Sequence, residues 1–461
     1  MKKIPQRLKI VSAIALGSFI APLDSAMVKI ALPNISRYFD TGLGLVEWVL
    51  ISYLLVISGL LLSLGRLGDI WGHKRVYNSG FILFIIGSLL CALSPSLLFL
   101  IASRALQGAG AAMLMAVAPA IITTSSPVSS RGRYLGAIAA VVYIALAAGP
   151  VLGGYLTTFF GWRAVFVLNI PLAVIGFAYS ALVLPQTRGS HGERFDIRGS
   201  ILFFFSISAI ILAVSLGQRL GFFSIGILVT FIAGLLLMGI FFYRQKKKAN
   251  PIVDLGLFSK RIFSASNAAL FLNYTAQYSF LLIMPFFLQD LLGSSPYVSG
   301  LIIISFPLAV MVISPLSGIL SDRIGTRWLA WAGMVITSAG IFLLSTLGSS
   351  SPYRTIILYL CVVGAGSGLF ITPNNSAIMG STDPDRRGTA SAMISTMRNL
   401  GMVMGIALSG SIFTLRYNLL LEALGAQEAF ESALQGAFLA AAGLALASAL
   451  ISAVWARDKK K

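Results

Sequence analysis

Two charged residues inside long apolar segments are the side chains of this sequence best suited to chemistry. Asp24 lies within the apolar segment 9–31, two residues after Pro22, and Arg104 lies within the segment 98–123. A charge at membrane depth is costly, and such residues usually face a cavity, pair with another charge or carry a proton. Asp24 could exchange a proton, pair with a cationic solute, do both in alternation, or form a structural salt bridge.

The segments that hold these charges are predicted to be membrane-spanning helices. Hydrophobic residues make up 57% of the chain and charged residues 11%, against about 25% charged in soluble proteins. The apolar stretches are continuous rather than alternating, which favours helices over a β-barrel. We predict an all-α polytopic membrane protein. Its fourteen spans are expected at residues 9–31, 46–66, 77–95, 98–123, 134–158, 163–184, 200–217, 222–243, 263–290, 298–320, 328–348, 354–379, 390–414 and 434–456.

The basic residues predict the orientation of these spans. If both termini are cytoplasmic, 26 of the 34 lysines and arginines fall in cytoplasmic segments, as membrane proteins generally arrange them. Attraction to anionic lipid headgroups accounts for the net charge of +19 without any nucleic-acid partner. We therefore expect a multi-pass protein of the plasma membrane with both termini in the cytoplasm.

A charged loop occurs twice and predicts two related helical bundles. The loop 65–75 returns as 318–327, so that Asp69 and Asp322, like Gly72 and Gly325, are 253 residues apart. We predict a six-helix bundle at 1–187, two inserted helices with their linkers at 188–250, and a second six-helix bundle at 251–461. Two bundles that rock against each other are a physical basis for transport.

The loops themselves invite two interpretations. An aspartate at a helix end can accept hydrogen bonds from a neighbouring helix N-terminus and pair with arginine, and such contacts would gate the switch between states. The alternative is a solvated turn that only enforces topology. The candidate gating residues are Gly65, Asp69, Gly72, Lys74, Arg75, Asp322, Arg323, Gly325 and Arg327.

Several function classes find no support in the sequence. No nucleophile, base and metal constellation occurs in the spans, so we do not expect an enzyme. No phosphate-binding loop occurs, so we expect no ATPase in the chain and no cofactor. His73 and His191 each lack a second histidine nearby, so no metal site is expected.

Four motifs, in order along the chain, carry a family resemblance. They are Gly65-x-Leu67-Gly68-Asp69 with Gly72, Lys74 and Arg75; Arg104-x-x-Gln107-Gly108-x-Gly110; Gly136, Gly149, Pro150, Gly153 and Gly154; and the run Leu23–Pro33. Together they resemble a major facilitator superfamily transporter of the fourteen-span drug:proton antiporter type, over essentially the full length. The chain departs from the family pattern at Ile70, at Ala145 and at Lys29, where the family usually has asparagine.

The resemblance implies proton-coupled efflux of amphiphilic drugs or related small molecules by alternating access. It implies that Asp24 and Arg104 couple proton and substrate, although Arg104 could instead snorkel to the interface. It also implies that the glycines of the fifth span lie between the two halves, where their small size permits close helix approach. The expected partners are a small amphiphilic substrate, protons and the lipid bilayer, with a monomer in a prokaryotic inner membrane.

The substrate class stays open at this point. Lys29 is expected to snorkel outward, and Asp24 is expected to be the only acidic residue deep in a span, with Glu47 and Asp290 near outer ends. Possible cavity-lining residues are Gln107, Asn273, Gln277, Asn374 and Arg398. The alternatives to drug efflux are an exporter or flippase of an anionic or lipid-like metabolite, and a membrane sensor or scaffold that does not transport.

Overall fold

The computed structural model describes residues 6–127, 131–186, 196–248, 253–383 and 386–455. The predicted domain boundaries at 187/188 and 250/251, and His191, lie outside these ranges. Within them the elements, in chain order, are α1 (Gln6–Tyr38), α2 (Leu43–Val46), α3 (Trp48–Trp71), α4 (His73–Ala92), α5 (Leu97–Ser125), α6 (Arg131–Phe160), α7 (Arg163–Val183), α8 (Ile197–Leu220), α9 (Ile225–Lys246), η2 (Leu255–Ser259), α10 (Arg261–Phe286), η3 (Phe287–Leu291), α11 (Pro296–Ile303), α12 (Ser305–Ile324), α13 (Thr326–Leu344), α14 (Tyr353–Gly380), α15 (Arg387–Leu424) and α16 (Ala426–Trp455).

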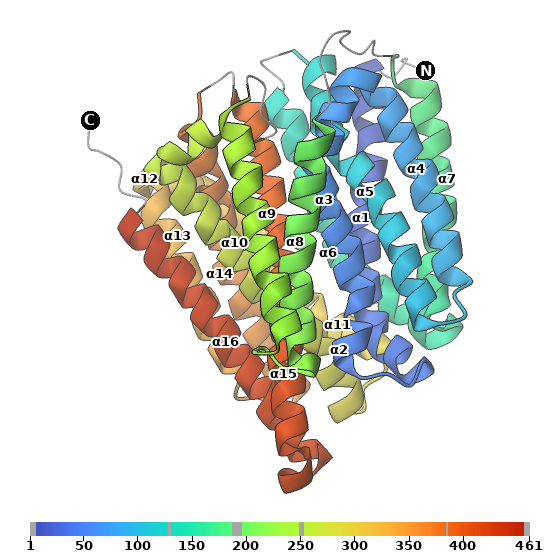
Figure 1. The fold of residues 1–461 in the computed structure, drawn as a ribbon, viewed down its shortest axis with the longest axis vertical. Coiled ribbons are helices and arrows are strands. Elements are labelled where there is room, and N and C mark those ends of the chain that lie inside the picture. The colour runs from blue at the N-terminus through green and yellow to red at the C-terminus, as the bar shows by residue number, and fades with distance from the viewer. Residues whose placement is uncertain (1–5, 128–130, 187–195, 249–252, 384–385, 456–461) are drawn as a thin grey trace.

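The described residues form fourteen helical spans that are long and apolar enough to cross a membrane, which confirms the predicted number. Three spans consist of two consecutive elements: α2 with α3, α10 with η3, and α11 with α12. The thirteenth span is longer than expected, because α15 continues to Leu424 rather than ending near residue 414. Short connections force neighbouring spans to run in opposite directions, as Figure 1 shows.

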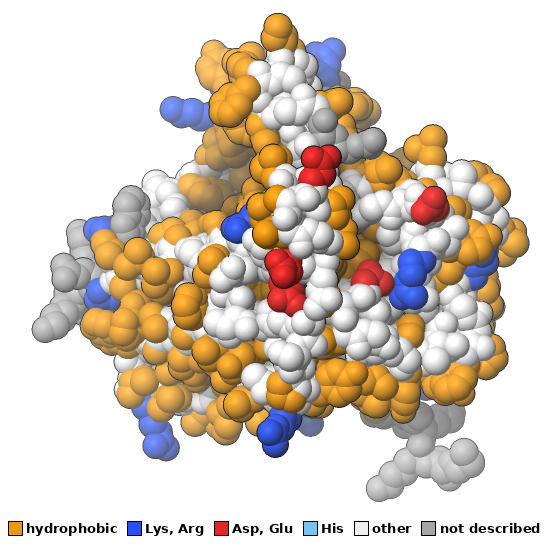
Figure 2. Space-filling model, turned by 90° about the horizontal axis from the view of Figure 1, so that it is seen from below, with side chains coloured by type: hydrophobic (Ala, Val, Ile, Leu, Met, Phe, Trp, Pro, Cys, Tyr) orange, Lys and Arg blue, Asp and Glu red, His pale blue; other side chains and the backbone are white. Residues whose placement is uncertain are grey.

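We call the end of the bundle where α1 begins and α16 ends the terminal face, and the other end the distal face. Helices α1–α7 and α10–α16 lie on opposite sides of the molecule, with α8 and α9 in front of the seam between them (Figure 1). Seen from the distal face, the surface is largely apolar or uncharged, and its few carboxylates lie in the central and right-hand parts of the view (Figure 2).

The internal repeat is visible in how the helices pack. Gly108 of α5 lies against the backbone of Tyr53 in α3, and Gly364 of α14 lies against the backbone of Phe306 in α12. The two glycines are 256 residues apart and their two partners are 253 apart. A side chain at either glycine would collide with the neighbouring backbone, so both halves need glycine for the same helix approach.

The repeated loops also use their cations in the same way. Lys74 Nζ donates to the carbonyl of Ala181 over 2.8 Å, and Arg327 Nε donates to the carbonyl of Ala453 over 2.8 Å. Ala181 and Ala453 lie in the last turns of α7 and α16, where free carbonyls carry the negative end of the helix dipole. In each half, therefore, a loop cation caps the final helix of its own bundle.

The inserted helices form a hairpin that contacts both halves. Asp196 caps α8 by accepting from the amide of Gly199, and it also binds Gln245 and Lys248, at the end of α9, over 3.0 and 2.7 Å. Farther along α8, Ser200 bonds to Ser63 of α3, and the carbonyl of Val214 accepts from Ser411 of α15. The pair thus packs across the seam rather than beside one bundle.

The two bundles are joined near the distal face. Asn34 donates to Gln289 over 2.9 Å, and Gln289 donates to the carbonyl of Ile30 over 2.9 Å. Arg37 pairs with Asp290 at 3.4 Å. Helix α11 packs against the distal end of α6, where the amide of Tyr297 donates to Thr158. These contacts close the seam at the distal end.

Candidate functional site

The structure brings Asp24 and Arg104 together in one buried network inside the N-terminal bundle. Both side chains are 0% exposed. Asp24 Oδ2 accepts from Arg104 Nη1 over 2.5 Å, and Asp24 Oδ1 accepts from Asn169 Nδ2 over 2.6 Å and from Gln107 Nε2 over 3.2 Å. The carboxylate therefore receives three donors from two helices, α5 and α7, that flank α1.

The guanidinium of Arg104 has hydrogen-bond partners at Nε and Nη1 and an aromatic ring on one face. Its Nε donates to the carbonyl of Val49 over 3.0 Å and its Nη1 to Gln107 over 2.5 Å, while the guanidinium lies 4.0 Å from the centre of the Tyr53 ring. The interpretation of Arg104 as a snorkelling residue is wrong, because its side chain pairs with a carboxylate at membrane depth rather than reaching an interface. Its Nη2 has no hydrogen-bond partner among the described residues.

This geometry is that of a buried ion pair with supporting hydrogen bonds. Three donors, one of them a full positive charge, stabilise the carboxylate in a dry site. A proton that reached Asp24 would neutralise it and leave the buried guanidinium without its counter-ion. The network could then persist only if Arg104 moved or found another anionic partner, so a proton on Asp24 would require the network to rearrange.

Helix α1 connects this network to the seam. Gly149 of α6 lies against Ala26, and Gly153 lies against the backbone of Met27. Gly154, on the next position of α6, faces the carbonyl of Pro296 in the other bundle. The glycines of the fifth span thus sit where α1, α6 and α11 meet, except Gly136, which has no other atom within 4 Å of where a side chain would begin.

Lys29 does not snorkel outward, and that expectation is wrong. The side chain is 8% exposed and its ammonium lies 4.2 Å from the centre of the Tyr278 ring on α10. The reason is that its face of α1 packs against the C-terminal bundle rather than against lipid. A cation–π contact replaces the solvent that a free ammonium would have.

Glu47 also differs from expectation. It lies at the distal end of its span, as predicted, but it is 0% exposed, so Asp24 is not the only buried acid within a span. Burial results from the short break between α2 and α3, which places Glu47 beneath α8 and α15. Asp290, by contrast, stays at the distal surface in its pair with Arg37.

The candidate cavity residues occupy different places. Gln107 belongs to the Asp24 network, and Gln277 donates to Asn273 over 2.9 Å and to Ser367 over 3.1 Å inside the C-terminal bundle. Arg398 of α15 bonds to Tyr274 of α10.

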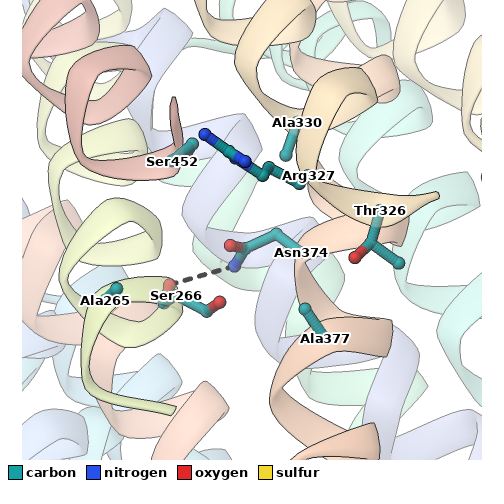
Figure 3. A pocket seen from close by; sticks show the side chains of 8 residues that line it. All are labelled: Ala265, Ser266, Thr326, Arg327, Ala330, Asn374, Ala377 and Ser452. Carbon is teal, nitrogen blue, oxygen red and sulfur yellow. Dashed lines mark hydrogen bonds between the residues drawn. The ribbon is translucent and has the colours of Figure 1, made fainter. Parts of the chain in front are cut away.

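Asn374 lines a small cavity at the terminal end of the C-terminal bundle, where it donates to the carbonyl of Ser266 over 3.0 Å (Figure 3). The volume of 10 Å³ offers room for about one water molecule. That cavity is too small to hold a drug-sized solute, so the structure gives Asn374 a role in packing.

The loop residues make contacts within their own bundles in this conformation. Asp69 lies 3.1 Å from His73 and 4.0 Å from Arg66. Gly72 and Gly325 both adopt positive φ, 93° and 87°, which favours glycine at each turn. The remaining candidates lie at the same end: Gly65 is half-buried, and Arg75, Asp322 and Arg323 are exposed. Their predicted gating role stays a prediction.

Sequence reasoning missed two members of the buried site. Asn169 supplies the second-shortest contact to Asp24, and Tyr53 covers the guanidinium while its hydroxyl donates to the carbonyl of Ala21. The sequence did hold a signal for Asn169, since an amide within the apolar run of the sixth span is itself a polar group at membrane depth. Nothing in the sequence pointed to Tyr53.

Comparison with known proteins places this site in a family. The Major Facilitator Superfamily profile matches residues 14–259 and 267–461. The chain is 33% identical to the riboflavin transporter RibZ of Clostridioides difficile, over 88% of each protein. It is 32% identical to the multidrug resistance protein Stp of Mycobacterium tuberculosis, over 87% of this chain and 74% of Stp.

A solved structure shares the fold. It is a bacterial homologue of the human lysosomal transporter Spinster, in an inward-facing and unoccupied conformation, with a TM-score of 0.72 and 13% identity over 98% of both chains. The relatives are transporters rather than enzymes, in agreement with the expectation from sequence. The chain is a multi-pass membrane protein and belongs to the Major Facilitator Superfamily.

Proposed function

We propose that this protein exports small amphiphilic molecules in exchange for protons by alternating access. The basic residues favour a cytoplasmic terminal face. With that orientation, the conformation described here is closed toward the outside by the contacts among Asn34, Gln289, Arg37 and Asp290. Similarity to the multidrug resistance protein Stp supports efflux of drug-like solutes.

The observation that carries this proposal is a buried carboxylate on α1, the helix of the N-terminal bundle that contacts α10 and α11 of the other bundle. Asp24 is two residues from Ala26 and five from Lys29, which contact α6 and α10 respectively. Protonation of Asp24 would release Arg104 and alter α1 at the seam. A proton entering from outside would in this way be linked to the movement that carries a solute outward.

Dye accumulation in everted membrane vesicles with an imposed pH gradient tests the proposal, because the cytoplasmic face then points outward and export carries dye into the lumen. We expect accumulation to follow the gradient in the wild type and to lose that dependence in Asp24→Asn, which keeps the size of the side chain but cannot exchange a proton. Asp40→Asn is the matched control, because Asp40 is exposed at the distal face and its loss should leave coupling intact.

Three results would contradict the proposal. Efflux that ignores the gradient in the wild type would exclude proton coupling. Unchanged coupling in Asp24→Asn would exclude Asp24 as the coupling residue. Solute binding without any turnover would favour the sensor or scaffold instead.

A second candidate function is export of an anionic metabolite. Lys29 and Arg398 lie beside Tyr278 and Tyr274 on the same helix, α10, between the two bundles. Neither cation has a carboxylate partner among the described ion pairs, and the charge of Asp24 is already balanced by Arg104. The similarity to the riboflavin transporter RibZ adds riboflavin to the solutes worth testing.

A transport panel of anionic, zwitterionic and cationic fluorescent probes of similar size separates the two candidates. Preference for anions, reversed toward cations in Lys29→Met, would support the anionic solute. Preference for cations in the wild type would contradict it and favour the drug exporter.

A further inference from the structure

The second buried carboxyl group, Glu47, has an environment opposite to that of Asp24. Its Oε1 accepts one hydrogen bond, from Ser215 of α8 over 2.9 Å. Its Oε2 is buried without a partner among the described residues and lies against Gly410 of α15. Asp24 has three donors, one of them a guanidinium, whereas Glu47 has one hydroxyl.

The surroundings of Glu47 are polar but uncharged. On α8 they include Ser215 and Gln218, and on α15 they include Gly410 and Thr414, with Gly44 of α2 between Gln218 and Thr414. The buried side-chain polar atoms of Gln218 and the hydroxyl of Thr414 have no partners among the described residues. The junction therefore offers polar groups but no strong donor to a charge.

Among the side chains that the structure describes, the charged groups of two neighbouring elements are engaged elsewhere. Arg37 of α1 pairs with Asp290, Arg416 of α15 bonds to Ser432, and no described ion pair involves Glu47. An unpaired carboxylate in such a site is strongly disfavoured, and a group in this situation is neutralised by a proton. Two buried acids, one paired with a guanidinium and one without a charged partner among the described residues, suggest a division of roles.

The position of Glu47 connects its protonation to conformation. The residue lies at the distal end of α3, in contact with α8 and with α15 of the other bundle, so it is covered only while the distal seam is closed. Gly410 is essential to this cover, because any side chain there would occupy the space of the carboxyl group. When the bundles part at the distal end, Glu47 meets water and can ionise.

We propose that Glu47 is a second proton-binding site, which holds a proton while the distal seam is closed and exchanges it with water at the distal face when the seam opens. In the closing direction the carboxylate takes a proton from hydronium, giving a neutral carboxylic acid and water. The proposal rests on the alternating access proposed above, and adds that acid at the distal face favours closure. For one proton, the ratio of closed to open molecules rises up to about tenfold per unit fall in pH.

Distance measurements by electron spin resonance between two labels test this directly. Pro95→Cys and Ser350→Cys place labels on exposed distal loops of the two bundles, in a Cys361→Ala background, with the buried Cys91 left in place. The full-length protein is placed in lipid nanodiscs and measured from about pH 5 to pH 9. We expect the short, closed distance to dominate in acid and the long distance to grow in alkali.

Glu47→Gln keeps the shape of the neutral side chain and should stay closed over the whole range, whereas the matched control Glu428→Gln, exposed on the same face, should follow the wild type. An infrared band of a protonated carboxylic acid, present in the wild type and lost in Glu47→Gln, provides a readout that does not depend on the labels.

The proposal is overturned if Glu47→Gln keeps the full pH response, or if the infrared band is unchanged in that variant. The transport assay and the distance measurement can give negative results independently of each other. A wild type that shows no proton-driven efflux but retains a Glu47-dependent pH response would contradict the proposed function and leave the proton site intact. Loss of the pH response in Asp24→Asn alone would assign it to Asp24 and contradict this inference.

Discussion

Removing both charges of the Asp24–Arg104 pair should lower the free energy of unfolding by no more than removing either charge alone. Asp24→Asn leaves a fully buried guanidinium without a counter-ion, and Arg104→Met leaves a fully buried carboxylate with two neutral donors. Removal of one partner of a buried pair typically lowers the free energy of unfolding by about 3–5 kcal/mol. The sum of the two single losses is then about 6–10 kcal/mol.

The double variant Asp24→Asn/Arg104→Met should lose much less than that sum. It retains two costs: the carbonyl of Val49 loses its donor, at about 1–3 kcal/mol, and the cation–π contact with Tyr53 is lost, at about 2 kcal/mol. We therefore expect a total of about 3–5 kcal/mol, and the midpoints of the two ranges give a coupling energy of about 4 kcal/mol.

The assay measures the free energy of unfolding of the wild type and the three variants in bicelles, with steric trapping as the method that reports reversible unfolding. Transport in the same variants adds a second reading: the double variant should fold yet lose dependence on the pH gradient. If the losses of the two single variants simply add, to within about 1 kcal/mol, the pair is not energetically coupled and the reasoning about the site fails.

Three further predictions concern other parts of the molecule. Gly154→Val should lower the ratio of molecules with a closed distal seam to molecules with an open one by about 5- to 150-fold, since overpacking costs about 1–3 kcal/mol, and the same spin-label distances would report it. Arg327→Met should lower the free energy of unfolding by about 1–2 kcal/mol through loss of its bond to the carbonyl of Ala453, whereas the exposed Arg323→Met should not. Partial burial opposes ionisation of Asp196, but its hydrogen bonds outweigh this and hold its pKa below the ordinary value of 3.8. The stabilisation by Asp196 is therefore complete above that value and is lost as pH falls through the lower, folded-state pKa. Thermal unfolding from about pH 6 to pH 3 should show this loss, and Asp196→Asn should lack it.

Much of the architecture followed from the sequence because a membrane-spanning helix is determined by the residues of its own segment. A run of apolar residues must form a helix in lipid whatever else the chain does, so fourteen spans and a repeat of 253 residues were predictable. The repeat even located equivalent contacts, since Lys74 and Arg327 are one repeat apart and cap equivalent helices.

The sequence identified several residues of the site but not the contacts between them. Asp24 and Arg104 were recognisable as buried charges, yet their pairing joins residues 80 apart and depends on how α1 and α5 are rotated. Lys29 was wrongly expected to snorkel outward, and Glu47, although at the outer end of its span as expected, was not recognised as buried, for the same reason. A position near the end of a span normally permits contact with water, and only the packing of another bundle or of the inserted helices takes that contact away.

The inserted hairpin makes the transporter lopsided within the plane of the bilayer. Helix α8 spans the gap between α3 and α15, through Ser63 on one side and Ser411 on the other. On the opposite flank α6 meets α11 and α12 with no such cover, and apolar side chains of α12 such as Leu316 are exposed there. An apolar solute that diffuses sideways among the acyl chains thus has one flank, rather than two, by which it can reach the seam between the bundles. We expect lipid-borne cargo to arrive by the α6–α12 flank.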